Sequence, residues 1–97
     1  MKIFQGNVVI SKKGRDKSRY FVVLYMLDAQ FAILTDGDTR KLDHLKKKKI
    51  IHLESVPVRL EQIIRLYEQN QLKDSDVRKA LKEVREQREA AQQGKAD

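Results

Sequence analysis

Cationic side chains gather in two short stretches of this sequence. The first, from Ser11 to Arg19, holds five lysines and arginines and one aspartate, and the second, from Arg40 to Lys49, includes four consecutive lysines. Such groups bind phosphate oxygens, and a lysine ammonium registers phosphate position and shape rather than base identity. The candidate residues for contact with a nucleic-acid backbone are Lys12, Lys13, Arg15, Lys17, Arg19, Arg40, Lys41, Lys46, Lys47, Lys48 and Lys49.

Two aromatic residues directly follow the first basic stretch. Tyr20 and Phe21 can each stack on an unpaired base, which is worth roughly 1–3 kcal/mol, but both also suit a core or the rim of a sheet. The lysine run likewise has two interpretations. Consecutive side chains of an extended segment alternate between faces, so two of the four ammonium groups would face any one partner. The same lysines would also protect an exposed sheet edge from aggregation.

Other kinds of chemistry have little support in the sequence. The absence of cysteine excludes disulfides and thiolate metal sites. His44 and His52 have no third histidine beside them, whereas a zinc site needs three or four convergent ligands. Asp36, Asp38 and Asp43 suit turns and caps, and no nucleophile–base pair or phosphate-binding glycine pattern is present. We therefore expect no enzyme activity, no cofactor and no metal.

The first half of the chain has the pattern of a small antiparallel sheet. Short runs of β-branched and aromatic residues alternate with turn residues, and the connections at 28–30 and 36–37 have the length or composition of hairpin turns. We predict strands at 7–11, 20–27, 31–35, 40–42 and 50–54. Five short strands with such turns are typical of a small SH3-like barrel.

The second predicted strand is apolar on both faces, and one of them needs a cover. Its side chains divide into Tyr20, Val22, Leu24 and Met26 on one face and Phe21, Val23, Tyr25 and Leu27 on the other. Two amphipathic helices in the second half can supply the cover. Their apolar stripes are Leu60, Ile63, Ile64 and Tyr67, followed by Val77, Ala80, Leu81 and Val84.

The ends of these helices also have sequence signals. Pro57 suits the first turn of the first helix, and residues 70–73 form a plausible break between the two. Asp74 or Ser75 can cap the second helix. After Glu86 the apolar stripe stops, and we expect the tail to fray.

The residues of the first basic stretch resemble a known motif. Gly14-Arg15-Asp16-Lys17-Ser18-Arg19, preceded by alternating apolar residues and followed by Phe21-Val22-Val23, is similar to the KOW motif of large-subunit ribosomal proteins and NusG-type elongation factors. Residues 31–37 resemble its second hairpin, and residues 40–42 with 46–53 resemble its closing strand. Residues 1 to about 54 resemble the bacterial KOW domain-containing RNA-binding proteins, which are similar to large-subunit ribosomal protein fourteen of archaea and eukaryotes.

The resemblance has one departure. Ser18 stands where the motif normally has its most characteristic glycine. Serine tolerates a positive φ poorly compared with glycine, at a cost on the order of 1 kcal/mol. Either the backbone at Ser18 is ordinary, or the loop is strained and its contact with RNA is altered.

The resemblance and the charge together predict an RNA-binding function. Net charge is +7, and residues 1–54 carry 12 lysines and arginines against 6 acids, whereas residues 55–97 carry 9 against 8. The expected fold is mainly β with appended α: an SH3-like KOW barrel in residues 1–54 and a two-helix extension with a frayed tail in residues 55–97. The resemblance implies ribosomal RNA as partner, ribosomal proteins as further partners and a cytoplasmic, ribosome-associated location. No apolar run approaches the roughly 20 residues of a membrane helix.

Two alternatives belong to other classes. SH3-like and KOW barrels also dock on proteins, and fold alone does not decide function. In that case the chain is a protein-interaction module of the transcription or translation machinery, with an interface on the helices at Leu60, Ile64, Tyr67, Val77 and Leu81. DNA binding is a weaker option because no basic recognition helix is evident and the second helix is nearly neutral.

Overall fold

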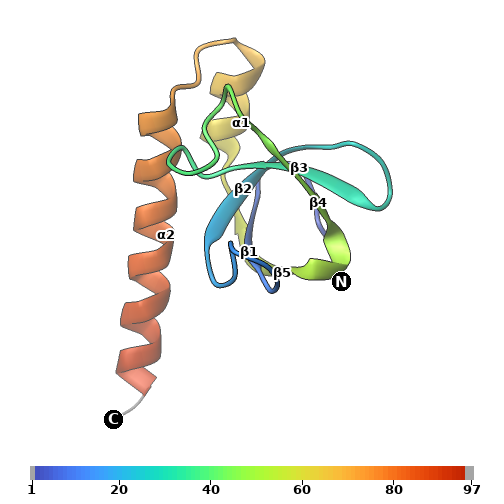
Figure 1. Cartoon of the computed structure of the whole chain (residues 1–97). Coiled ribbons are helices and arrows are strands. Elements are labelled where there is room, and N and C mark those ends of the chain that lie inside the picture. Colours follow the sequence, from blue (N-terminus) through green and yellow to red (C-terminus); the bar gives the residue numbers. More distant parts are fainter. Residues whose placement is uncertain (1, 96–97) are drawn as a thin grey trace.

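The computed structural model describes residues 2–95, which form one five-stranded antiparallel sheet and two α-helices (Figure 1). The strands are β1 (Asn7–Ser11), β2 (Tyr20–Met26), β3 (Phe31–Thr35), β4 (Lys46–Lys49) and β5 (Leu53–Arg59), and the 3₁₀ turn η1 (Ile50–His52) joins the last two. The helices are α1 (Glu61–Glu68) and α2 (Asp74–Lys95). The strand order is β4-β3-β2-β1-β5. The predicted succession of five antiparallel strands and two C-terminal helices is confirmed.

The fourth strand is the lysine run and not the predicted segment 40–42. Lys46–Lys49 pairs with β3 at the edge of the sheet, where a strand needs backbone partners on one side only and lysines are well tolerated. Residues 40–42 lie in the β3–β4 loop, where the Arg40 carbonyl accepts from the turn at Asp36 and two N–H groups donate to side chains. Arg40 N–H donates to Asp36 Oδ1 at 2.7 Å, and Leu42 N–H donates to Asp74 Oδ1 at 2.8 Å. Such local bonds compete with a sheet ladder.

Pro57 lies within β5 and does not begin a helix. The predicted strand 50–54 divides into η1 and the start of β5, which then continues to Arg59. Because β5 is the other edge of the sheet, the missing N–H of Pro57 is tolerated there. The β1–β5 pairing shifts beside it, and the buried Asn7 side chain bridges the irregularity by donating to the Val56 carbonyl at 2.9 Å.

β2 is buried on both faces, as its sequence predicts. Phe21 and Val23 belong to one core cluster, which also includes Val9, Leu34 and Leu53, and Val22 and Leu24 belong to another that includes residues of the helices. Phe21 is fully buried. It is therefore a core residue, which confirms one of the two interpretations of Phe21, and its ring is not accessible for stacking on a base.

The alternation along β2 reverses after Leu24. The β2–β3 register shifts between Val23 and Tyr25, and such a bulge moves the following side chains to the opposite face. Met26 consequently packs against the cluster of Phe21, and Tyr25 stacks on Tyr67 of α1 with ring centroids 6.5 Å apart. The predicted faces of Tyr25 and Met26 are thus exchanged.

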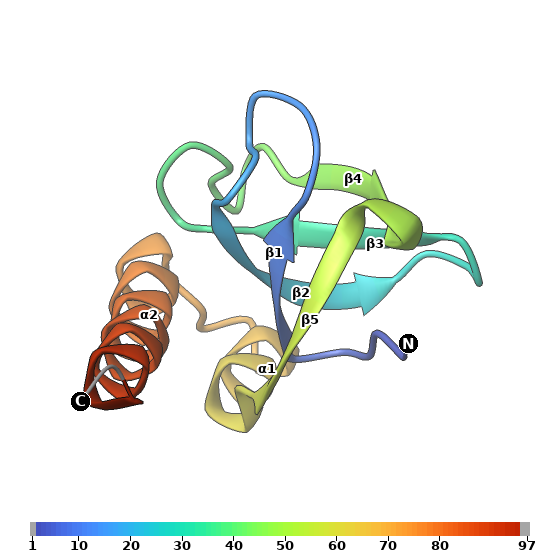
Figure 2. The same cartoon turned by 90° about the horizontal axis from the view of Figure 1, so that it is seen from below.

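Helix α2 covers the outer face of β2, and Figure 2 shows it as a layer beside the sheet. Val77, Leu81 and Val84 are all buried in the cluster that contains Val22 and Leu24. Each such side chain contributes about 1.5–3 kcal/mol of burial free energy. The predicted stripe of the second helix is confirmed. It is the cover that the two-faced strand requires.

The break at 70–73 is confirmed, but the predicted cap and tail differ. Lys73 N–H donates to Asp76 Oδ2 at 3.0 Å, whereas Asp74 bonds to the β3–β4 loop. α2 continues to Lys95, so the expected fraying after Glu86 is wrong for residues 87–95, whose Ala, Glu and Gln favour helix. Residues 96 and 97 lie outside the described residues.

Across the described part of the chain, the helices are too short or too polar to cross a membrane.

The turn after β3 is organised by one buried carboxylate. Asp36 is 5% exposed, and its Oδ1 accepts hydrogen bonds from the N–H groups of Asp38 and Arg40 at 2.9 and 2.7 Å. Its Oδ2 accepts from Thr39 Oγ1 at 2.7 Å. Burial raises the pKa of Asp36, but the hydrogen bonds, led by that of Thr39, lower this pKa more, and it ends below its ordinary value.

The same turn packs against the first part of α2. Arg78 Nη1 donates to the Gly37 carbonyl at 2.6 Å. Gly37 has φ +72°, and a Cβ there would overlap the Asp74 carbonyl oxygen. Only glycine fits this position without a shift of backbone. The Asp36 turn therefore fixes where α2 begins.

Replacing Asp36 by alanine is expected to lower the free energy of unfolding by about 1–3 kcal/mol, because three partly buried donors lose their acceptor. Urea denaturation at neutral pH measures the change. Asp43→Ala serves as a control, since Asp43 is an exposed aspartate of the same β3–β4 loop.

The Asp36 contribution should also depend on pH with a definite sign. Because the folded pKa lies below the ordinary value of 3.8, the stabilisation is complete above that value and is lost as pH falls through the folded pKa. The difference between the unsubstituted protein and the Asp36→Ala variant should narrow in acid. An equal difference at neutral pH and below the folded pKa would contradict the role given to this carboxylate.

Candidate nucleic-acid interface

The loop between β1 and β2 is closed by its own backbone. Ser18 N–H donates to the Ser11 carbonyl at 2.8 Å, Ser11 N–H donates to the Arg19 carbonyl at 3.1 Å, and Arg19 N–H donates to the Asp16 carbonyl at 2.9 Å. These bonds tie both ends of the loop to the sheet. The cations between them are therefore held on a defined scaffold.

Ser18 has φ +73°, in the left-handed region. Of the two possibilities for this position, the structure has the strained one, since an L-residue pays about 1–2 kcal/mol there. The motif's glycine would adopt this conformation without that penalty. Gly14, at the start of the loop, has a similar φ of +82°.

Four of the five cations in this loop point into solvent. Lys12, Lys13, Arg15 and Lys17 are exposed, and among the side chains that the structure describes none of them forms an ion pair within 4 Å. Arg19 differs, because its Nη1 lies 3.5 Å from Asp36 Oδ2 and 3.7 Å from Asp38 Oδ2. Part of its charge is thus balanced within the protein.

The four lysines of β4 alternate between two faces. Lys46 and Lys48 are half-buried and face the β1–β2 loop: Lys46 Nζ lies 3.8 Å from Asp16 Oδ2, and Lys48 Nζ donates to Ser11 Oγ and the Lys13 carbonyl, both at 2.8 Å. Burial and then the neighbouring Lys46 lower the pKa of Lys48. Lys48 therefore bridges strand and loop, and two of its three N–H donors are used.

The other two lysines of β4 are exposed. Lys47 Nζ lies 4.5 Å above the centre of the Phe31 ring. Lys49 lies near His52, as do Lys12, Lys13 and Lys48. Partial desolvation is the largest cause that lowers the pKa of His52, and the positive charges of these four lysines lower it further. His52 thus reports a cluster of like charge at the base of the loop.

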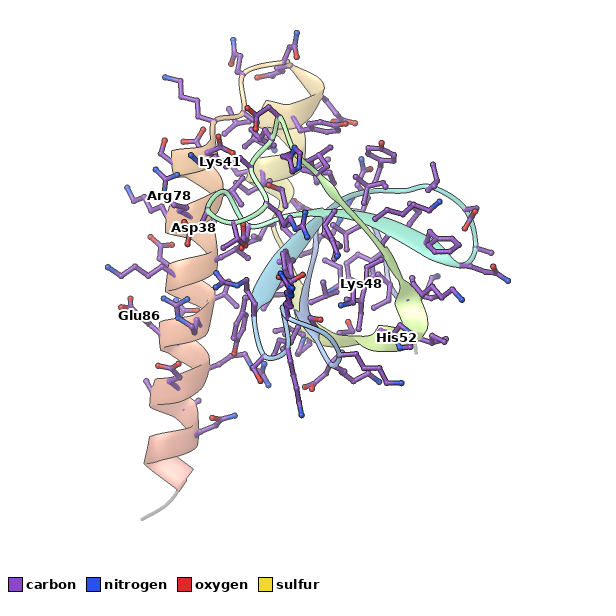
Figure 3. All side chains as sticks on the ribbon, in the orientation of Figure 1. Asp38, Lys41, Lys48, His52, Arg78 and Glu86 are labelled. Carbon is purple, nitrogen blue, oxygen red and sulfur yellow. The ribbon has the colours of Figure 1, made fainter. Side chains whose placement is uncertain are left out.

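Figure 3 shows one of the two remaining predicted residues, Lys41, near the start of α2 and apart from Lys48 and His52. Arg40 is close enough to Lys48 to contribute to its lowered pKa. The structure thus brings most predicted cations to one flank but places Lys41 apart from the β4 lysines.

A cleft of about 490 Å³ separates the β1–β2 loop from α2. From the loop it is lined by Arg15, Lys17 and Arg19, and from the helix by three cations that the sequence reasoning missed: Arg78, Lys82 and Arg85. Each follows a residue of the buried stripe by one position, so they form a second row about 100° around the helix. That repeated spacing was the available signal, hidden by the near-neutral charge of the whole helix.

Tyr20 lies on the wall of this cleft. It is half-buried, its Oη accepts a hydrogen bond from Arg88 Nη1 at 3.3 Å, and the Arg88 guanidinium lies 6.0 Å from the ring centre. One ring face is therefore shared with an arginine of α2. Tyr20 is a rim residue, and its contact with a base stays a prediction.

Replacing Ser18 by glycine should stabilise the protein by about 0.5–1 kcal/mol. Relief of the left-handed strain stabilises the folded state, and the greater freedom of glycine in the unfolded chain offsets part of this gain. Thermal or urea denaturation measures this. Ser75→Gly is the matched control, and it should destabilise, since glycine in a helix costs about 1 kcal/mol. Destabilisation by Ser18→Gly would mean that the serine side chain outweighs its backbone strain.

The pKa of His52, followed by NMR, should lie below the ordinary value of 6.5 at low salt and rise as salt screens the lysines. Lys13→Gln should raise it, because Lys13 is the strongest of the four charge contributors. Lys47→Gln is the control, because Lys47 lies over the Phe31 ring and is not one of the four lysines that lower the pKa of His52. Because the folded pKa is depressed, the folded state binds fewer protons, and this group's contribution to stability falls as pH drops through 6.5. A pKa at or above 6.5 at low salt would contradict the lysine cluster.

Comparison with known proteins adds no support for a function of the β1–β2 loop and the cations around it. No protein-family model matches the chain, and no curated protein matches it either. The resemblance to the KOW domain-containing proteins therefore stays a prediction from the loop residues. What the structure adds is the arrangement of cations around that loop.

Proposed function

We propose that this chain is a non-catalytic RNA-binding protein with an SH3-like KOW barrel, which contacts the backbone phosphates of structured RNA and acts on or near the ribosome. The observation that carries the proposal is the gathering of exposed, unpaired cations on one rigid loop, Lys12, Lys13, Arg15 and Lys17. Lys49 extends this surface along β4. RNA duplexes are bound mainly through shape, phosphates and 2′-hydroxyls, which suits such groups.

The connection between the two edge strands supports the barrel. In a flat five-stranded sheet β4 and β5 would lie roughly 19 Å apart, since neighbouring strands are about 4.8 Å apart. The chain from Lys49 to Leu53 spans at most about 14 Å even when extended, and η1 shortens it further. The sheet must therefore curl so that its edges approach one another. Lys12 N–H donates to the His52 carbonyl at 2.8 Å, which continues the β1–β5 pairing into η1.

The acidic residues near the loop pair with the cations that hold the loop in place, and they do not neutralise the outward cations. Asp16 and Asp36 each pair with a cation that anchors the loop, Lys46 and Arg19 respectively. The outward cations have no such partner among the described side chains. Because like charges that stay unpaired repel one another, a polyanion is the partner that relieves them.

The strained backbone at Ser18 supports the resemblance to the KOW motif. The motif has glycine at this position, and the loop adopts the φ that glycine prefers. A serine held there despite the cost indicates that the loop geometry is imposed by the surrounding bonds.

The protein-interaction alternative has less to support it. Among its proposed interface residues, Val77 and Leu81 are buried against the sheet, Ile64 is also buried, and Leu60 and Tyr67 are half-buried. An interface needs such side chains to be accessible to the partner. On the helices, the surface that this alternative requires is already used within the chain.

To test the proposal, Lys12, Arg15 and Lys17 would be changed together to glutamate. Arg19, which the sequence also predicts to bind phosphate, is best left in place, because a glutamate there would face the buried Asp36 carboxylate. Affinity for a structured RNA hairpin, measured by fluorescence polarisation, should fall at least about 100-fold as three phosphate contacts become repulsive. A variant with glutamate at Arg65, Lys73 and Lys79, all exposed on the helices or the segment that joins them, has the same net charge and should bind nearly normally.

Salt dependence gives an independent measure. With about six phosphate contacts, log K should fall with log salt at a slope near −4 to −5. A slope shallower than about −2, or equal loss of affinity in the two triple variants, would contradict phosphate binding by this loop. Crosslinking in cells and sedimentation with ribosomes would then test the ribosomal part of the proposal.

A further inference from the structure

The cleft between the β1–β2 loop and α2 is concave and strongly basic. Six cations line it, three from each side, and its two carboxylates, Asp36 and Asp38, both lie beside Arg19. The remaining cations are Arg15 and Lys17 on the loop and Arg78, Lys82 and Arg85 on the helix. The excess positive charge therefore faces an open space rather than a protein partner.

The α2 cations divide into an anchor and two outward groups. Arg78 donates to the Gly37 carbonyl at 2.6 Å and so holds the helix to the Asp36 turn. Lys82 and Arg85 are exposed, and among the described side chains neither forms an ion pair within 4 Å. They are thus placed to bind an anion that enters the cleft.

The size and lining of the cleft limit what can enter. A volume of about 490 Å³ is within the range of small-ligand pockets, roughly 300–1,000 Å³. This space admits a nucleotide but not a double helix. Tyr20 and Leu81 provide the less polar part of the wall. A basic groove with an aromatic ring is the combination that binds unpaired nucleic acid, with phosphates on the cations and a base on the ring.

We infer that this cleft binds an unpaired segment of the RNA strand, with phosphates on Lys17, Lys82 and Arg85 and a base against Tyr20. The inference rests on the proposed RNA-binding function and specifies which feature of the RNA is bound. α2 then has two roles, since one row of its residues covers β2 and the adjacent row forms a wall of the site. The protein should prefer a helix interrupted by a bulge over one that is fully paired.

The test uses two RNA hairpins with the same stem, one fully paired and one with a bulge of unpaired nucleotides. Lys82→Gln combined with Arg85→Gln removes the two outward charges, and glutamine retains helix propensity. The unsubstituted protein should bind the bulged RNA more tightly, and the double variant should lose this preference. Two phosphate contacts fewer should make the salt slope for the bulged RNA shallower by about 1.4.

A matched control comes from the same helix region. Lys73→Gln with Lys79→Gln removes equal charge from exposed residues that do not line the cleft. This variant should keep the preference for the bulged RNA and its salt slope. A second pair isolates the ring: Tyr20→Phe should bind as the unsubstituted protein does, and Tyr20→Leu should lose about tenfold for the bulged RNA only.

The outcomes separate the two proposals. If the unsubstituted protein binds neither hairpin, the proposed function and the cleft assignment are both wrong. If it binds both equally, or if the two glutamine variants behave alike, RNA binding stands and the cleft assignment is wrong. If a nucleoside monophosphate competes as well as the bulged RNA does, the cleft is a site for free nucleotides and the inference is also overturned.

Discussion

The burial of β2 on both faces is the constraint on which the rest of this structure depends. One face packs against buried residues of the other strands, such as Leu34 and Leu53, and the other is covered by Val77, Leu81 and Val84 of α2. Because those three residues must face Leu24 and its neighbours, the rotation of α2 about its axis is determined. The cations one position further along then face the β1–β2 loop. The packing of α2 on β2 thus determines the position of the α2 cations that line one side of the basic cleft.

Some charged residues around the β1–β2 loop form ion pairs that fix its geometry, and others remain exposed at its surface. Asp36 lies under the turn, where it binds three neighbouring donors and pairs with Arg19, and Asp16 pairs with Lys46. These contacts use charge to fix geometry, and half-buried pairs suffer less from solvent screening than exposed ones. Among the side chains that the structure describes, the outward cations Lys12, Lys13, Arg15 and Lys17 form no ion pair within 4 Å. The same flank is therefore rigid at its base and positive at its surface.

The fold was largely readable from local patterns, but its exceptions share a cause. β1, β3 and nearly all of β2 follow from runs of β-branched and aromatic residues, and α1 and α2 follow from their apolar periodicity. The lysine strand, Pro57 within β5 and the bulge after Leu24 break local rules. At each of them the sheet decides: edge positions tolerate lysine and proline, and register determines which face a residue occupies.

The sequence by itself determined that cations crowd the β1–β2 loop, that β2 needs two partners and that α2 has an apolar stripe, since composition and spacing are local properties. Only the tertiary structure decided which charges act together. It paired Arg19 and Lys46 with aspartates, separated Lys41 from the β4 lysines, and brought Lys82 and Arg85 to the loop. Electrostatic interaction depends on distance through space, and residues more than sixty positions apart become neighbours only when the helix packs on the sheet.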